Sequence, residues 1–129
     1  MRISQAARAA GTTQKALRYY ESIGLLREVA RTTSGYRDYT AQAVGRATFV
    51  RRSRDAGLTL DRTAQILAAF DAGRDACAAV EDELSRELAD LDRRIAELTA
   101  LRAVVAARRE AVRAADPAVC DRGQVCSFL

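Results

Sequence analysis

The chain has 129 residues, of which 21 are Lys or Arg and 17 are Asp or Glu, so its formal net charge is +4. That length accommodates one domain, or one small domain with an extension, and excludes large multidomain enzymes. No apolar run reaches the roughly 18 residues that a membrane span needs, and the first residues lack the apolar stretch of a signal peptide. We therefore expect a soluble, cytoplasmic protein that does not associate with membranes.

Basic residues are concentrated in the first half of the chain. Residues 1–69 contain 12 basic and 5 acidic side chains, whereas residues 70–129 contain 9 basic and 12 acidic ones. Every basic residue except Lys15 is an arginine, whose fork matches phosphates and guanine edges. A high-GC genome would also favour arginine over lysine, but it would not produce the asymmetry between the halves. The first half is therefore predicted to bind a polyanion.

Two short helices joined at a glycine are predicted at the start, over about residues 4–23. Ser4 is expected to cap the first helix and Gly11 to end it. Thr13 is expected to cap the second helix, which stops at Gly24. The inner face of the second helix repeats at helical spacing: Ala16, Leu17, Tyr20 and Ile23. Its outer face carries side chains suited to a major groove, as in the recognition helix of a helix-turn-helix: Gln14, Lys15, Arg18 and Tyr19.

A short basic hairpin is predicted over residues 31–39. Threonines and tyrosines flank the dipeptide Ser34-Gly35, a pattern typical of a hairpin turn. Such a ribbon beside a helix-turn-helix makes a winged helix. Its side chains Arg31, Tyr36 and Arg37 would then lie along a phosphate backbone.

Two further helices complete the predicted winged helix-turn-helix domain, which covers residues 1–70. Thr40 is expected to cap one helix that runs to about Ala56, and Thr59 is expected to cap another that runs through Phe70. The exposed side of the first of these two helices is predicted to carry three arginines: Arg51, Arg52 and Arg54.

One long helix is predicted over residues 75–115, because no glycine or proline occurs between Asp75 and Asp116. Apolar residues recur along it at steps of three or four: Cys77, Val80, Leu84, Leu88, Leu91, Ile95, Leu98, Leu101 and Val105. Such a narrow stripe is a coiled-coil seam. A helix of about 60 Å is too long to bury its seam against a domain of about 70 residues. We therefore expect a second copy of the chain to cover it, with residues 116–129 forming a loop and tail.

Three strings in the first half carry a family resemblance. They are KALRYYESIGLL at residues 15–26, SGYRDY at residues 34–39 and RRSRDAG at residues 51–57. With these strings the chain resembles the MerR family of bacterial transcription regulators from residue 1 to about residue 70, and the long helix and cysteine loop follow in the family's order. The resemblance implies an antiparallel coiled-coil homodimer that binds a palindromic promoter and distorts it so that RNA polymerase can use it.

The resemblance also assigns residues to the contact with double-stranded promoter DNA. Alone, any one basic side chain would be read as a solvated surface charge, but together on one module they favour duplex DNA. The expected contacts lie on the recognition helix, the wing and the third helix: Lys15, Arg18, Tyr19, Tyr20, Arg31, Ser34, Tyr36, Arg37 and Arg54.

Three cysteines lie at the two ends of the predicted long helix, Cys77 at its start and Cys120 and Cys126 beyond its end. Within one chain about 60 Å of helix would separate them, so they could not share a metal ion. An antiparallel dimer would place Cys77 of one subunit beside the loop of the other and create two equivalent three-thiol sites. Three sulfurs without any histidine suit a thiophilic ion, namely Hg(II), Cd(II), Pb(II), Zn(II) or Cu(I).

The family resemblance narrows the choice of metal. Sensors of divalent ions in the family have a cysteine where Cys77 stands, whereas the Cu(I) branch has serine there. Zinc sensors of the family also use a loop histidine, which this chain lacks. Hg(II), Cd(II) and Pb(II) therefore rank above Zn(II), and Cu(I) is less favoured. The first loop cysteine of those sensors falls at the place of Val112, eight residues before Cys120. Either the loop folds back to restore the site, or an oxygen of Asp116 or Asp121 is the third ligand.

Other roles for the thiols stay open. The spacing of Cys120 and Cys126 permits a disulfide, and hence redox or electrophile sensing, and the same pair alone could form a Cu(I)-type site. Cys77 could also be a small apolar residue of the seam, with incidental tail thiols. An enzyme is not predicted, because the chain lacks histidine, a glycine-rich phosphate loop and a cluster of carboxylates. A purely architectural DNA-bending protein would need no cysteines.

Overall fold

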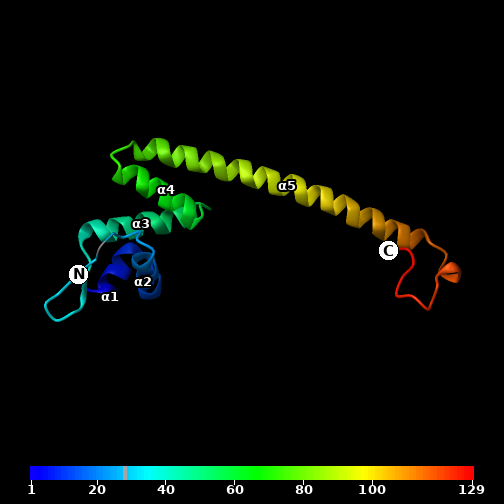
Figure 1. Cartoon of the computed structure of the whole chain (residues 1–129), viewed down its shortest axis with the longest axis horizontal. Helices are drawn as coiled ribbons and strands as arrows, with labels where there is room; N and C mark the ends of the chain where they lie inside the picture. Colours follow the sequence, from blue (N-terminus) through cyan, green and yellow to red (C-terminus); the bar gives the residue numbers. More distant parts are fainter. Residues whose placement is uncertain (28) are drawn as a thin grey trace. The chain divides into compact units, whose positions relative to one another are not determined.

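The computed structural model describes residues 1–27 and 29–129, and it is mainly helical (Figure 1). The chain divides into two compact units, Met1–Ser85 and Arg86–Leu129. This confirms the predicted fold class, mainly α with a helix-turn-helix and a short wing. The elements follow one another in this order: α1 (Ile3–Ala10), α2 (Gln14–Ser22), β1 (Ala30–Arg31), β2 (Arg37–Asp38), α3 (Ala41–Asp55), α4 (Leu60–Asp71), α5 (Ala76–Ala114) and the 3₁₀ turn η1 (Pro117–Val119).

The helix-turn-helix is formed by α1 and α2. Gly11 ends α1 in the left-handed conformation, with φ of 69°, and the Thr13 hydroxyl caps α2 by accepting from the backbone N–H of Ala16 at 3.0 Å. The predicted cap at Ser4 is wrong, because α1 already begins at Ile3, which packs against the core. The extended residue before the helix is therefore Arg2.

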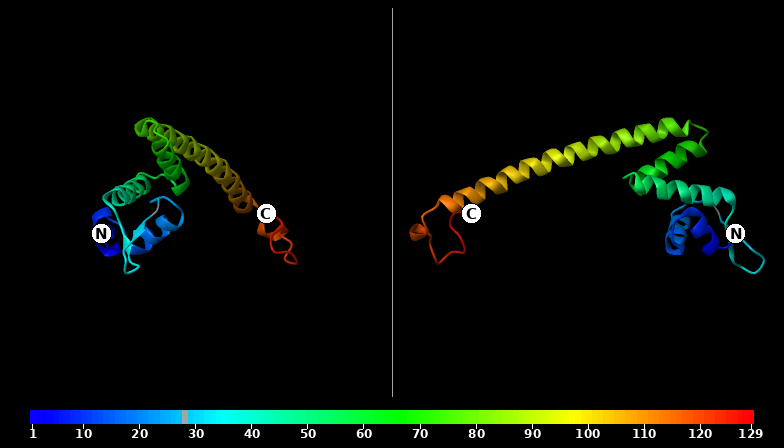
Figure 2. Two further views of the ribbon diagram at one scale, coloured as in Figure 1. Left: turned by 60° about the vertical axis from the view of Figure 1, so that its left-hand side comes forward. Right: turned by 180° about the vertical axis from the view of Figure 1, so that it is seen from behind.

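The core of the first unit lies where α1 packs on α2 and on α3 (Figure 2). Three alanines of α1 are buried, and their small side chains let α3 approach closely. Larger side chains fill the remaining space, and the fully buried ones in this cluster are Leu17, Leu26, Tyr39 and Val50. Ile23, predicted on the inner face of α2, is 44% exposed, because α2 ends at Ser22 and the chain turns there.

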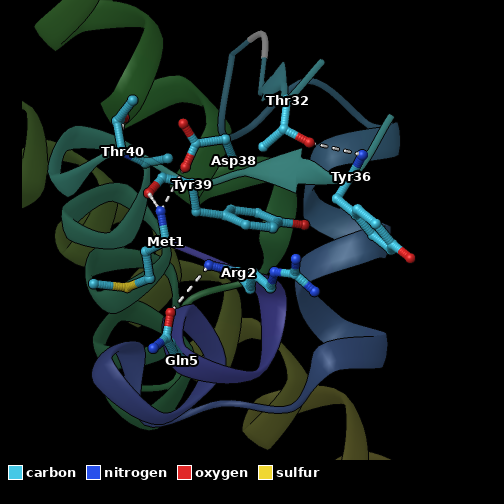
Figure 3. A network of polar contacts seen from close by, with 9 residues as sticks. Met1, Arg2, Gln5, Thr32, Tyr36, Asp38, Tyr39 and Thr40 are labelled. Carbon is cyan, nitrogen blue, oxygen red and sulfur yellow. Dashed lines mark hydrogen bonds and ion pairs between the residues drawn. The ribbon is translucent and has the colours of Figure 1, made fainter. Parts of the chain in front are cut away.

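The wing is a two-stranded antiparallel ribbon in which Ala30 pairs with Asp38 and Arg31 with Arg37. Its turn is closed by the Thr32 N–H, which donates to the Tyr36 carbonyl at 2.7 Å. The first residue of the chain joins the ribbon, since the Tyr39 N–H donates to the Met1 carbonyl at 2.7 Å (Figure 3). The start of α1 is thereby held beside β2.

Two predicted caps and one incorrect prediction concern α3 and α4. The Thr40 hydroxyl accepts from the Ala43 N–H at 3.1 Å, and the Thr59 hydroxyl accepts from the Arg62 N–H at 3.2 Å, so both caps are confirmed. Arg51, however, does not join an exposed row. Its Nε donates to the Ala10 carbonyl at 3.0 Å, because α1 crosses α3 at this point and its last carbonyls need a donor.

Ion pairs tie α4 to its neighbours within the first unit. Arg46 is buried and donates to both carboxylate oxygens of Asp71, at 2.7 and 3.1 Å, while its Nε donates to the Leu25 carbonyl at 2.7 Å. These hydrogen bonds from Arg46 lower the pKa of the Asp71 carboxyl. Arg62 of α4 pairs with Glu83 in the first turns of α5 at 3.2 Å. These contacts thus connect four parts of the first unit: the segment that follows α2, the helix α3, the helix α4 and the start of α5.

The helix α5 is 39 residues long. Its large apolar side chains are between 37% and 64% exposed at the predicted seam positions: Leu84, Leu88, Leu91, Ile95, Leu98, Leu101 and Val105. Asp75 caps its start, with Oδ1 accepting from the Cys77 N–H at 2.9 Å. Among the residues that the structure describes, no helix combines the length and the apolar character required to cross a membrane.

Candidate nucleic-acid interface and thiol residues

The outer face of α2 is exposed as its sequence pattern requires. Gln14, Lys15, Arg18 and Tyr19 are all exposed, and Tyr19 retains 53% of its surface. These four side chains lie on one face of the helix, and Leu17 and Tyr20 on the opposite face are buried. The helix therefore offers two long cations, an amide and a phenol to a partner.

Tyr20 does not belong to this face, which corrects its inclusion among the expected contacts. Its side chain is 7% exposed and is part of the core cluster. The reason is helical periodicity, because Tyr20 lies three residues after the buried Leu17 and so points inward. The family string includes two adjacent tyrosines, and of these Tyr19 is the one that faces outward.

Four arginines line one hollow of about 390 Å³, between the start of α1, the helix α2 and the wing. We call it the basic hollow, and its lining residues are Arg2, Ile3, Ser4, Gln14, Arg18, Arg31, Gly35, Tyr36 and Arg37. None of these lining residues is acidic. A concave surface with several cations and no carboxylate concentrates positive potential and attracts polyanions.

Arg2 is the member of the basic hollow that the sequence analysis missed. Its guanidinium carbon lies 4.6 Å from the centroid of the Tyr36 ring, a cation–π contact that joins the start of α1 to the wing (Figure 3). Tyr36 is 56% exposed. No periodic pattern marks Arg2, which lies next to Met1, whose carbonyl accepts from the N–H of Tyr39 just after β2.

The wing arginines make different contacts. Arg31 is exposed, and its Nη1 donates to the Gly35 carbonyl at 3.2 Å across the turn, near the exposed Ser34. Arg37 is half-buried, and its Nε donates to Oε2 of Glu21 at 2.7 Å. Arg31 is therefore exposed and bonded within the wing, whereas Arg37 is tied to α2.

Tyr39 shares the same carboxylate of α2. Its hydroxyl donates to Oε2 of Glu21 at 3.3 Å, and its side chain is 1% exposed. Burial raises the pKa of the Tyr39 hydroxyl, and the negative charge of Glu21 raises it further. At neutral pH the hydroxyl is therefore a hydrogen-bond donor.

Arg54 lies exposed in the last turn of α3, as expected for a contact with solvent or a partner. Arg52 is exposed as well. Arg51, in contrast, has its guanidinium shared between the Ala10 carbonyl and Asp55, at 3.0 and 2.9 Å. Of the three arginines predicted on this helix, two are therefore available to a ligand.

The three cysteines are free thiols in different parts of the chain. Cys77 is exposed in the first turn of α5, within the first unit, whereas Cys120 and Cys126 are half-buried in the second unit. The Ser127 hydroxyl lies 3.9 Å from the Cys120 sulfur. Within residues 1–27 and 29–129 of one chain, no three Cys, Asp or Glu side chains are grouped for a metal ion. A site shared between two copies stays a prediction.

The two aspartates proposed as extra ligands shape the tail. Oδ1 of Asp116 accepts from the Ala118 N–H at 2.9 Å, and Oδ1 of Asp121 accepts from the Gly123 N–H at 2.8 Å. The tail then runs back along α5, since Leu129 lines a shallow hollow together with Val112 (Figure 1). The return of the tail brings its last residue, Leu129, beside Val112 near the end of α5.

Two family models match most of the chain. Residues 1–69 match the model described as "MerR HTH family regulatory protein", and residues 44–108 match the model described as "MerR, DNA binding". The second match begins in α3 and continues far into α5. The similarity to known families is therefore not confined to the helix-turn-helix.

Individual relatives are similar over most of their own length. The transcriptional regulator HmrR of Rhizobium leguminosarum bv. viciae is 41% identical over 102 residues, which are 79% of this chain and 78% of HmrR. The regulator CueR of Salmonella typhi is 32% identical over 120 residues, 93% of this chain and 87% of CueR. The crystal structure of PbrR691 from Ralstonia metallidurans in complex with lead(II) matches with a TM-score of 0.74 and 30% identity, covering 100% of this chain and 96% of PbrR691.

Proposed function

Because the chain belongs to the MerR family of helix-turn-helix regulatory proteins, we propose that it is a homodimeric transcription regulator that distorts promoter DNA when it binds a thiophilic metal ion. Its relatives are transcriptional regulators and not enzymes. One observation carries the DNA-binding half of this proposal. Four arginines and Tyr36 meet in one hollow directly beside the exposed face of α2.

In this proposal residues 1–70 form the DNA-binding domain. Lys15, Arg18 and Tyr19 on α2 read base edges in the major groove, where an arginine can bond both guanine acceptors. The wing and α3 hold the phosphate backbone through Arg31, Ser34, Tyr36, Arg37 and Arg54. Each phosphate that these arginines neutralise releases a counterion, so binding is expected to be strongly salt-dependent.

We propose that residues 75–115 pair with the same segment of a second chain in an antiparallel coiled coil. The support is the row of seam side chains, which are 37% to 64% exposed along α5. Exposed leucines at such regular spacing are unfavourable in water. The seam of a second chain would bury them and stabilise the dimer by about 25 cal/mol for each Å² of apolar surface removed from water. The dimer would present two DNA-binding domains to a palindromic operator.

The proposed metal site combines the partner's Cys77 with Cys120 and Cys126 in the segment 116–129. Three thiolates favour soft ions, and PbrR691 was crystallised with lead(II). Hg(II), Cd(II) and Pb(II) are the expected ligands, followed by Zn(II). Cu(I) held by the two tail thiols is the alternative, because Cys120 and Cys126 are both free in one short segment. Redox or electrophile sensing by the same pair is a further candidate.

Metal binding would act by favouring one of two dimer states. An ion shared between the loop of one subunit and the partner's helix draws these two segments together, and the change in the coiled coil alters the angle between the DNA-binding domains. The altered angle bends and untwists the promoter for RNA polymerase. The ion can shift the equilibrium only by as much as its affinities for the two states differ.

A mixed dimer tests whether the site is shared. Binding of Pb(II) is measured by the absorbance of the thiolate–metal bond. As homodimers, neither Cys77→Ser nor the double variant Cys120→Ser/Cys126→Ser is expected to bind Pb(II). Co-expressed with different tags, they form a dimer with one complete site and one empty site. That mixed dimer is expected to bind one ion at wild-type affinity. If it binds none, the thiols are not shared between subunits.

Selection from a randomised duplex tests the DNA-binding half. The pool should be long enough for two half-sites separated by one or two helical turns, and the reduced full-length protein is used as bait. We expect inverted repeats to be enriched, because the dimer presents the same α2 twice with two-fold symmetry. Enrichment of no sequence, or of single half-sites alone, would contradict the proposal. The most enriched sequence is called the selected duplex below.

A further inference from the structure

Glu21 is an acidic residue at the edge of a surface proposed to bind a polyanion. It lies in the last turn of α2, and its side chain is 19% exposed. The adjoining basic hollow contains four arginines and no acid. A carboxylate in this position repels phosphates, so its presence in α2 needs a reason beyond electrostatics with DNA.

The geometry around Glu21 supplies that reason. A single oxygen, Oε2, accepts from Arg37 Nε at 2.7 Å and from the Tyr39 hydroxyl at 3.3 Å. Arg37 belongs to the wing, and Tyr39 is buried in the core. The buried Tyr39 therefore holds the Glu21 carboxylate in place. The carboxylate in turn holds Arg37, which would otherwise be a long, mobile cation.

We propose that Glu21 is a positioning residue that orients the Arg37 guanidinium for a phosphate and locks the wing to the recognition helix. This inference rests on the proposed function, since it assumes that the basic hollow receives DNA. The guanidinium is planar, so fixing it at Nε also fixes the direction of its two terminal nitrogens. Those nitrogens are the pair that a phosphate takes in a bidentate contact, and the Arg37 side chain is 34% exposed at the hollow.

The wing needs such an external support. Its strands are two residues long and pair at two positions, and a ribbon of this size is marginal by itself. The Glu21–Arg37 bond spans 16 residues of sequence and joins the second strand directly to α2. Because the cost of ordering Arg37 is met in the free protein, less entropy is lost when DNA binds.

Two substitutions separate positioning from charge. Glu21→Ala and Glu21→Gln remove the same negative charge, but only glutamine keeps an oxygen that can accept from Arg37 Nε. We expect Glu21→Gln to bind a mixed-sequence duplex within about threefold of wild type. We expect Glu21→Ala to bind about thirtyfold more weakly, because each dimer loses two ordered phosphate contacts. Asp61→Asn, which removes an exposed charge of α4, serves as the control for charge alone.

The double variant provides the decisive comparison. If Glu21 acts through Arg37, then Glu21→Ala/Arg37→Ala binds no more weakly than Arg37→Ala, instead of showing the product of the two losses. The salt slope of Glu21→Ala is likewise expected to fall by about 1.8, as for Arg37→Ala, since two contacts are lost per dimer. Equal or tighter binding by Glu21→Ala, or equal weakening of both Glu21 variants, would overturn the inference.

A measurement on the unmodified protein covers the case in which Glu21→Ala does not fold. The nitrogen-15 resonance of Arg37 Nε is recorded in the wild-type dimer with and without the mixed-sequence duplex. The inference requires the hydrogen-bonded Nε signal to persist when DNA is added. Its loss would mean that phosphate competes with Glu21 for Arg37. If the wild-type protein binds no duplex at all, the proposed function fails and the inference fails with it.

Discussion

The salt dependence of DNA binding can be worked out from the basic hollow. Each protomer offers four arginines there, Arg2, Arg18, Arg31 and Arg37, so a dimer offers eight. If each of them neutralises one phosphate, Arg18 in addition to its base contact, the hollow contributes about −7 to the slope of log K against log salt, since each contact contributes about −0.9. Replacing one of these arginines by alanine removes two contacts from the dimer and should reduce the slope by about 1.8.

Fluorescence anisotropy with a labelled mixed-sequence duplex measures these slopes over a series of salt concentrations. Arg37→Ala is expected to weaken binding to every duplex and to show the reduced slope. Arg18→Ala should also lose discrimination between the selected and mixed-sequence duplexes, because its position on α2 faces the bases in our proposal. Arg74→Ala, an exposed arginine between α4 and α5, is the matched control. A wild-type slope in Arg37→Ala would refute the assignment of the hollow.

Three further predictions concern the scaffold and the dimer. Asp71→Asn leaves the buried Arg46 without its carboxylate and should lower the free energy of unfolding by about 3 kcal/mol at pH 7 in urea titrations. Because the pKa of Asp71 is lowered by folding, this difference is present above the unfolded pKa of about 3.9 and should disappear as the pH falls through the folded value. A difference that stays constant down to acid pH would contradict this. Gly11→Ala should cost about 1–2 kcal/mol in thermal unfolding, since φ is +69° and the added Cβ would lie 2.8 Å from Nε of Arg51; an unchanged melting temperature would count against it. Ile95→Asp places a charge at the middle of α5, where two antiparallel copies would meet, and should raise the dimer dissociation constant at least about a hundredfold in sedimentation experiments; a dimer of unchanged stability would exclude this seam.

Local chemistry made much of the fold predictable. The hydroxyls of Thr13, Thr40 and Thr59 each cap the helix that follows, because an N-cap depends on residues within one turn of it. Gly11 ends α1 for an equally local reason. The failure at Ser4 has the opposite origin, since the start of α1 is set by the packing of neighbouring side chains against the core and not by the best available cap.

The interface was predicted less completely because its contacts are made between distant segments. Arg2 lies at the wing beside Met1, whose carbonyl accepts from the Tyr39 N–H just after β2, and nothing in the local sequence marks that contact. Glu21 is one residue of the string KALRYYESIGLL, and its bond to Arg37 forms only once the wing is folded against α2. For Tyr20 the helical period correctly predicts burial, whereas the family string placed it among the DNA contacts.

The cysteines show a different limit of sequence reasoning. Cys77 and the tail thiols lie in separate units of one chain, so their proposed meeting is a property of two chains. The spacing of residues along one sequence can suggest such a meeting through an antiparallel pairing. It cannot decide between a shared trio and the tail pair, Cys120 and Cys126. The mixed dimer distinguishes these two arrangements directly.

The buried fork of Arg46 has a mechanical consequence. It fastens the segment after α2 to the end of α4, while the Arg62–Glu83 pair fastens α4 to the root of α5. These contacts make the first unit rigid between the start of α5 and α2. In our proposal, a rotation of the start of α5 would therefore be transmitted to α2 with little loss. Without the Arg46 and Arg62 contacts the rotation would be lost within the first unit, and the bound duplex would stay straight.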